Sequence, residues 1–106
     1  MLTEIDRQIA NKFQSRLNAI AHAAVVYVFG SRARGEAAED SDLDMFIELD
    51  ILTPELRQQI FELASEIGFD TDRVITTIVT THEELQYGAM GANPLIAAVE
   101  REGIHL

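Results

Sequence analysis

Residues 24–29 form a run of apolar side chains that ends abruptly at Gly30-Ser31. The run, AVVYVF, is rich in β-branched and aromatic residues, which is typical of a strand buried on both faces. It is far shorter than the roughly 20 apolar residues that cross a membrane, and no other apolar run of the chain approaches that length. Such a strand needs further elements to cover it, so we expect a globular domain with a sheet in its core.

A second strand is predicted directly after, because side chains of residues 42–49 alternate between polar and apolar. The apolar positions are Leu43, Met45, Ile47 and Leu49, and the positions between them are Asp42, Asp44, Phe46 and Glu48. This alternation gives the strand one core face and one mostly acidic face. Asp42 and Asp44 therefore project from the same face, where two carboxylates can share divalent metal ions.

Helices are expected around these strands, because capping residues precede several segments with helical spacing. The first predicted helix is capped by Thr3 and has an apolar stripe of Ile5, Ile9, Phe13, Leu17 and Ile20. The others are a short helix over 31–34 stopped by Gly35, a helix from Thr53-Pro54 to Gly68, a turn of helix capped by Thr81, and a helix from Asn93-Pro94 to about Glu102. Between these helices we expect a polar loop over 36–41 and a third strand over 74–80. The order α-β-α-β-α-β-α predicts an α/β (α+β) fold, a small mixed β-sheet packed by helices.

Composition narrows the classes of function. At 106 residues we expect one domain over 1–106, and the absence of cysteine excludes disulfides, zinc fingers and thiol catalysis. His22, His82 and His105 show no metal-ligand spacing. A net charge of -10 argues against general nucleic-acid binding, and it suits either a basic protein partner or simply solubility. The first residues lack the order of a signal peptide, so we expect a cytoplasmic protein with no membrane contact.

The Gly30-Ser31 pair is a candidate phosphate-binding turn, because it stands between a buried strand and a helix start. Together with the carboxylates of Asp42 and Asp44 it indicates metal-dependent phosphoryl or nucleotidyl transfer. A P-loop is excluded, since Glu36-Ala37 stands where Lys and Ser/Thr are required. An EF-hand is excluded as well, since Met45 replaces its essential glycine.

The pattern Gly30-Ser31, ten intervening residues, then Asp42-Leu43-Asp44 resembles the signature of the DNA polymerase β-like nucleotidyltransferases. Most of the chain is similar to the minimal nucleotidyltransferases, a branch that includes the antitoxins of HEPN-partnered toxin–antitoxin pairs. The resemblance implies that Gly30 and Ser31 hold the triphosphate of ATP and that Asp42 and Asp44 bind Mg²⁺ as catalytic and metal-binding residues. Arg34 is a further candidate for nucleotide binding.

Two points stay open within the resemblance. Arg32 and Arg34 are candidates for phosphate contact, and the alternative is that they are surface residues paired with the acids of 36–41. The family also has a third carboxylate on a later strand, whereas residues 74–80 contain no acid. Asp72 is the nearest candidate for it by chain order, and Asp70 lies further away.

The function expected from the resemblance is Mg²⁺-dependent transfer of AMP from ATP to a hydroxyl of a partner protein, an HEPN-domain ribonuclease toxin that the chain would neutralise as its antitoxin. One alternative is a degenerate antitoxin that acts by contact, as the missing third carboxylate suggests. Another is a nucleotidyltransferase that modifies a small molecule.

Overall fold

The computed structural model describes residues 2–21, 24–35 and 42–106, so the predicted loop over 36–41 and His22 lie outside it. The elements in chain order are α1 (Glu4–Asn18), β1 (Val25–Phe29), α2 (Gly30–Arg34), β2 (Leu43–Leu49), α3 (Pro54–Thr71), β3 (Ile75–Thr81), α4 (His82–Tyr87), the 3-10 helix η1 (Ala89–Ala92), α5 (Pro94–Glu102) and β4 (Ile104–His105). The expected order of helices and strands is confirmed, with η1 added between α4 and α5 and β4 added after α5. A two-residue strand and a single 3-10 turn are too short to leave a periodic pattern.

The sheet is mixed, as predicted, with the strand order β3-β2-β1-β4. β2 runs antiparallel to β1 and parallel to β3, with α3 as the crossover between the two parallel strands. The register pairs Asp44 with Phe29 on one side and with Thr76 on the other. β2 is therefore one of the two inner strands, and it holds both β1 and β3 in place.

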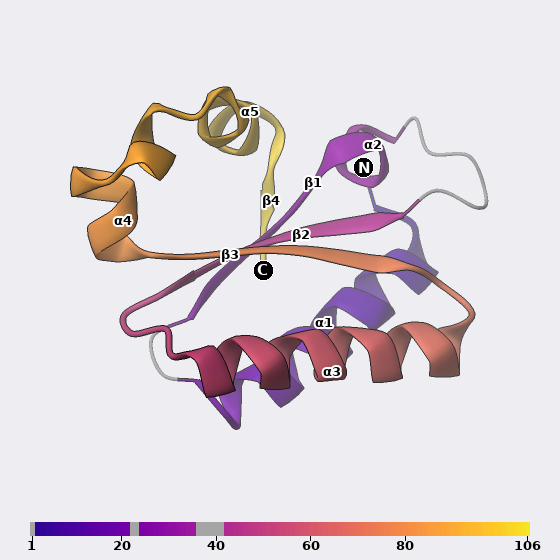
Figure 1. Cartoon of the computed structure of the whole chain (residues 1–106). Helices are drawn as coiled ribbons and strands as arrows, with labels where there is room; N and C mark the ends of the chain where they lie inside the picture. Colours follow the sequence, from indigo (N-terminus) through magenta and orange to yellow (C-terminus); the bar gives the residue numbers. More distant parts are fainter. Residues whose placement is uncertain (1, 22–23, 36–41) are drawn as a thin grey trace.

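Helices cover both faces of the sheet. α1 and α3 pack on one face, while α2, α4 and α5 lie on the other (Figure 1). The face towards α1 and α3 holds the main hydrophobic core, which is formed by Ile9, Phe13, Leu17, Val26, Val28, Leu43, Met45, Ile47, Leu49, Ile60, Leu63 and Ile67. Because the side chains of β2 alternate, Asp44 and Glu48 lie on the opposite, less covered face.

Each predicted capping residue makes the expected hydrogen bond. Thr3, Thr53 and Thr81 accept hydrogen bonds of 3.1 Å from the backbone N–H groups at the starts of α1, α3 and α4. Asn93 accepts one of 2.9 Å from the N–H of Leu95 at the start of α5. These side chains satisfy donors that helix starts leave without an intrahelical partner, and this is why the helix starts could be predicted from the capping residues.

Two expectations about burial and helix length are wrong. β1 is buried on one face only: Val26 and Val28 are inaccessible, whereas Tyr27 is half-buried because α5 covers that side incompletely. α3 continues past Gly68 and ends at Asp72, which adopts the left-handed conformation with φ 55°. Gly68 serves a close approach instead, since a Cβ there would lie 2.6 Å from the Arg73 carbonyl oxygen.

The described helices include none that is both long enough and apolar enough to span a bilayer. α3 is the longest of them at 18 residues, and its exposed side carries several charged groups.

The buried stripe of α1 is displaced from the predicted one by an acidic residue. Ile5 is 59% exposed, and Asp6 takes its place in the stripe with only 1% of its surface exposed. Ile20, expected at the far end of the stripe, lies beyond the helix and is 40% exposed. The spacing of apolar residues could not indicate this, because a buried carboxylate breaks the pattern that the prediction rests on.

Asp6 is buried because two arginines bind the same carboxylate oxygen. Asp6 Oδ1 lies 2.9 Å from Arg73 Nη1 and 3.4 Å from Arg32 Nη1. Burial alone would raise the pKa of Asp6, but hydrogen bonds from Arg73 and Thr3 and the charge of Arg32 outweigh it and hold that pKa below its ordinary value. The cluster joins α1, α2 and the short segment between α3 and β3. Arg32, for which phosphate contact or a surface position was expected, is instead a buried structural residue.

We predict that Asp6→Asn lowers the free energy of unfolding by about 3 kcal/mol, because it leaves the buried guanidinium group of Arg32 and the half-buried one of Arg73 without their shared carboxylate. The matched control is Glu66→Gln, which removes the surface ion pair with Arg16 and is expected to cost less than about 1 kcal/mol. Chemical denaturation measures both values.

The stability that Asp6 contributes depends on pH. The pKa of Asp6 is lowered in the folded state, so its stabilising contribution is present at neutral pH and is lost as the pH falls below about 3.9 and through that lowered pKa. The difference in the free energy of unfolding between the wild type and Asp6→Asn should therefore become smaller in acid. Equal losses for Asp6→Asn and Glu66→Gln at neutral pH would contradict the structural role of the cluster.

Candidate functional site

Gly30 and Asp44 lie against each other where β1 ends and β2 begins. Phe29 is the register partner of Asp44, so the next residue, Gly30, turns over the Asp44 side chain. Gly30 has φ 76°, and a Cβ added to it would collide with the Asp44 carboxylate at Oδ2. Glycine is required here both for its left-handed backbone and for the close approach of the carboxylate. The structure thus places the Gly30 turn beside one member of the predicted carboxylate pair.

Asp42 joins Asp44 on the same face. It is exposed and lies directly before β2, two residues ahead of Asp44. Its Oδ2 accepts a hydrogen bond of 3.2 Å from the Thr76 hydroxyl on β3, and Thr76 is also the register partner of Asp44. The two carboxylates and this hydroxyl form one polar cluster at the end of the sheet, next to Gly30.

The electrostatics of the cluster favour binding of a cation. Burial raises the pKa of Asp44, the neighbouring charge of Asp42 raises it further, and the positive charge of Arg34 partly offsets both. Two carboxylates that repel each other in this way are stabilised when a cation is placed between them. The charges of Asp42 and Arg34 thus both act on the Asp44 carboxylate.

Arg34 is held at the site by α5. Its Nη1 lies 3.1 Å from Glu102 Oε2, and Arg101 contacts the other oxygen of Glu102 at 3.3 Å. The hydrogen bond from Arg34 is the main reason that the pKa of Glu102 lies below its ordinary value, and Arg101 adds to it. Arg34 therefore stands between the acid of α5 and the Asp42–Asp44 pair, and the acids expected to pair with it, Glu36 and Glu39, lie outside the described residues.

The remaining predicted site residues lie at two separate places in the fold. Ser31, half-buried, follows Gly30 in the first turn of α2. Asp72 ends α3, is exposed, and lines a hollow of about 560 Å³ with Phe69 and Val74. Neither Asp72 nor Asp70 is among the charges that shift the pKa of Asp44. The structure therefore brings Gly30, Asp42, Asp44 and Arg34 together and gives Asp72 a helix-capping role.

Sequence reasoning missed Thr76 and Glu102. Thr76 lies in a uniformly β-branched strand, where nothing distinguishes one threonine from the next until the parallel register with β2 is known. Glu102 is one of several acids near the end of the chain, and only the packing of α2 against α5 brings it to Arg34. Both contacts join residues far apart in the chain, so no local pattern could indicate them.

The donor set fits Mg²⁺. Mg²⁺ prefers oxygen ligands and is typically held by one or two carboxylates together with water and substrate phosphates. Asp42 and Asp44 supply such a pair, and within residues 2–21, 24–35 and 42–106 no three His, Asp or Glu side chains come together as a complete protein cage. Such a pair is suited to share a cation with phosphate groups.

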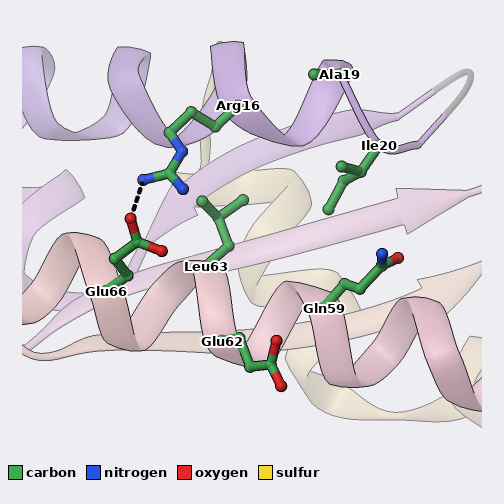
Figure 2. Close-up of a pocket in the computed structure, with 7 residues that line it drawn as sticks. All are labelled: Arg16, Ala19, Ile20, Gln59, Glu62, Leu63 and Glu66. Atoms are coloured by element: carbon green, nitrogen blue, oxygen red, sulfur yellow. Dashed lines mark ion pairs between the residues drawn. The ribbon is translucent and has the colours of Figure 1, made fainter.

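A separate hollow lies on the other side of the molecule, between α1 and α3. Figure 2 shows its lining, which has Leu63 in the middle, Ile20 at one side and the Arg16–Glu66 ion pair of 3.1 Å at the other. Its volume is about 310 Å³. It shares no residue with the Asp42–Asp44 cluster, because α1 and α3 cover the opposite face of the sheet.

Known proteins share this fold. The family model described as a nucleotidyltransferase domain matches residues 6–98. No curated protein is a significant match to the sequence. A toxin–antitoxin structure with AMP-PNP is 23% identical, with a TM-score of 0.65, and the match covers 90% of this chain and 69% of that chain.

Two further solved structures complete the comparison. The MntA-HepT toxin–antitoxin structure is 20% identical with a TM-score of 0.60, over 93% of this chain and 69% of that chain. A candidate minimal nucleotidyltransferase is 26% identical with a TM-score of 0.59, over 95% of both chains. The described fold is therefore the one that these proteins share.

We predict that Gly30→Ala destabilises the protein more than Gly35→Ala. Both glycines have φ 76°, so alanine at either position costs about 1–2 kcal/mol of backbone energy. At Gly30 the added methyl group also displaces the Asp44 carboxylate. Chemical denaturation gives the two losses, and a smaller loss for Gly30→Ala would contradict the close approach described above.

We also predict that Asp44→Asn raises the melting temperature at neutral pH. At pH 7 the carboxylate is charged in both states, and the folded state bears the cost of its burial and of its repulsion by Asp42. As the pH falls through the raised folded-state pKa, the native protein takes up the proton first and gains stability, so the advantage of the variant should disappear in acid. Asp50→Asn, which removes an exposed charge, is the control, and an equal effect of both variants would count against this account.

Proposed function

Because the chain belongs to the nucleotidyltransferase domain family, we propose that it transfers AMP from ATP to a hydroxyl group of a partner protein. The observation that carries the proposal is the pair Asp42 and Asp44 on one face at the start of β2, with Asp44 directly against the Gly30 turn. In a family of nucleotidyltransferases, a carboxylate pair beside a glycine turn suits binding of a metal-bound triphosphate.

Each residue of the candidate site has a proposed part in the reaction. Asp42 and Asp44 would hold Mg²⁺, which supplies positive charge to the phosphates of bound ATP. Gly30 and Ser31 would bind the triphosphate through the turn, and Arg34 would contact it from α2 while Glu102 restrains the guanidinium group. We further infer that residues 1–106 act as a single minimal nucleotidyltransferase domain.

The transfer balances as a displacement at phosphorus. The acceptor oxygen forms a bond to the α-phosphorus of ATP, the bond from that phosphorus to the leaving oxygen breaks, and pyrophosphate departs. The hydroxyl proton must pass to a base, because a neutral hydroxyl is a poor nucleophile. With Asp72 capping α3, we assign that base to the Asp42–Asp44 pair or to the partner protein.

The proposed partner is an HEPN-domain toxin, which the chain would modify and neutralise as its antitoxin. Two observations support this proposal: solved structures with this fold are toxin–antitoxin structures, and the net charge of -10 suits a ribonuclease with a basic RNA-binding face. The alternative is an antitoxin that acts by contact alone, which the absence of an acid from Ile75–Thr81 favours.

Calorimetry with ATP, in the presence of Mg²⁺ or of a chelator, tests nucleotide binding. We expect binding of modest affinity that depends on Mg²⁺, and we expect Asp42→Asn with Asp44→Asn to abolish that dependence while the fold persists. The control is Glu62→Gln with Glu66→Gln, which removes the same charge from α3 on the opposite face. Unchanged Mg²⁺-dependent binding in the Asp42/Asp44 variant would contradict the site.

The transfer step is tested by incubating the chain, ATP and Mg²⁺ with the protein of the neighbouring reading frame and measuring intact mass. A gain of one AMP on that protein supports the transferase, and tight binding without a change in mass supports the contact antitoxin. Asp72→Asn is expected to leave the transfer rate unchanged. A fall of about a hundredfold, the scale of losing a general base, would instead assign that role to Asp72.

A further inference from the structure

Thr76 occupies a position on β3 from which it can control the geometry of the carboxylate pair. It is the register partner of Asp44, so the two side chains lie side by side on the same face of the parallel strands. Its hydroxyl donates a hydrogen bond of 3.2 Å to Asp42 Oδ2. One side chain thus neighbours both carboxylates.

Asp42 needs an external restraint more than Asp44 does. Asp44 lies inside β2, paired on both sides, and its carboxylate is confined by Gly30. Asp42 is exposed and precedes the strand, and the charge of Asp44 pushes its carboxylate away. A hydrogen bond to a charged acceptor from a fixed donor opposes that repulsion.

Thr76 is suited to be that fixed donor. A threonine has a restricted χ1 because it is β-branched, and its backbone is fixed by the ladder that joins all seven residues of β3 to β2. The backbone bond of 2.9 Å from Leu43 N–H to the Val74 carbonyl extends this ladder towards Asp42. A carboxylate has two oxygens, so the bond to Thr76 restrains Asp42 without exhausting its capacity to bind a cation.

We infer that Thr76 is a positioning residue, whose hydroxyl holds the Asp42 carboxylate beside Asp44 so that both can bind one divalent cation. This inference rests on the proposed function, since it concerns the same metal-binding pair. Partners that orient metal ligands typically change metal affinity by 10- to 100-fold when they are removed. Because Thr76 acts on one of two ligands, we expect an effect at the lower end of that range.

The test measures binding of Mn²⁺ alone, by the electron paramagnetic resonance signal of the free ion, without nucleotide or partner. We expect Thr76→Val to weaken binding about tenfold, since valine keeps the shape and the β-branch but removes the donor. Thr76→Ser restores a hydroxyl and is expected to bind within about twofold of the wild type. Thr77→Val, which changes the next threonine of β3 on the other side of the strand, is expected to have no effect.

Mn²⁺ binding by the variants distinguishes a failure of the Thr76 role from a failure of the metal site. Mn²⁺ affinity that is the same in the wild type and in Asp42→Asn with Asp44→Asn overturns the metal site itself. If the double variant loses Mn²⁺ affinity but Thr76→Val binds Mn²⁺ as tightly as the wild type, only the role of Thr76 is overturned. The same holds if Thr76→Ser binds Mn²⁺ as weakly as Thr76→Val. Near-ultraviolet circular dichroism shows whether each variant keeps its packing. If Thr76→Val does not fold, Thr76→Ala removes the same hydroxyl, and binding equal to the wild type in that variant overturns the role of Thr76.

Discussion

The hydrogen-bonded register of β2 with its two neighbours determines where every part of the candidate site lies. The antiparallel ladder to β1 sets Asp44 opposite Phe29, and the parallel ladder to β3 sets it opposite Thr76. A slip of one residue would turn Asp44 into the hydrophobic core and Met45 out of it, which burial of the apolar positions forbids. The core therefore specifies the site, because the residues that fill one face of β2 fix what stands on the other.

Acidic and basic side chains are distributed unevenly over the fold. The chain has an excess of acids, and most arginines in the described residues are engaged by carboxylates: Arg32 and Arg73 by Asp6, Arg34 and Arg101 by Glu102, and Arg16 by Glu66. Two of these groups meet at α2, where Arg32 points into the structural cluster and Arg34 towards the site. A five-residue helix is thus anchored at both of its arginines, and this keeps the Gly30 turn in place although the helix itself is too short to be stable alone.

Most of the fold could be predicted from local patterns, and the parts that could not depend on contacts between distant residues. Alternation in β2, the threonine caps and the glycine after α2 are local signals, and they placed Asp42, Asp44 and Gly30 correctly on the molecule. The burial of Asp6 broke the helical stripe that the sequence suggested, since only the tertiary fold supplies its arginines. Thr76 and Glu102 were missed for the same reason, and the true end of α3 was missed because Asp72, not a glycine, adopts the left-handed conformation.

The parallel pairing of β2 with β3 has a consequence for when the site comes into being. The contact between Asp42 and Thr76 spans 34 residues of sequence, and the whole of α3 must form and dock between the two strands before it can close. Contacts of such high sequence separation form slowly, because the entropy of closing a long loop is lost before the pairing compensates for it. During synthesis, the carboxylate pair therefore emerges well before the hydroxyl that contacts it, and a nascent chain that ends before Thr76 carries the two acids without the strand that orders them.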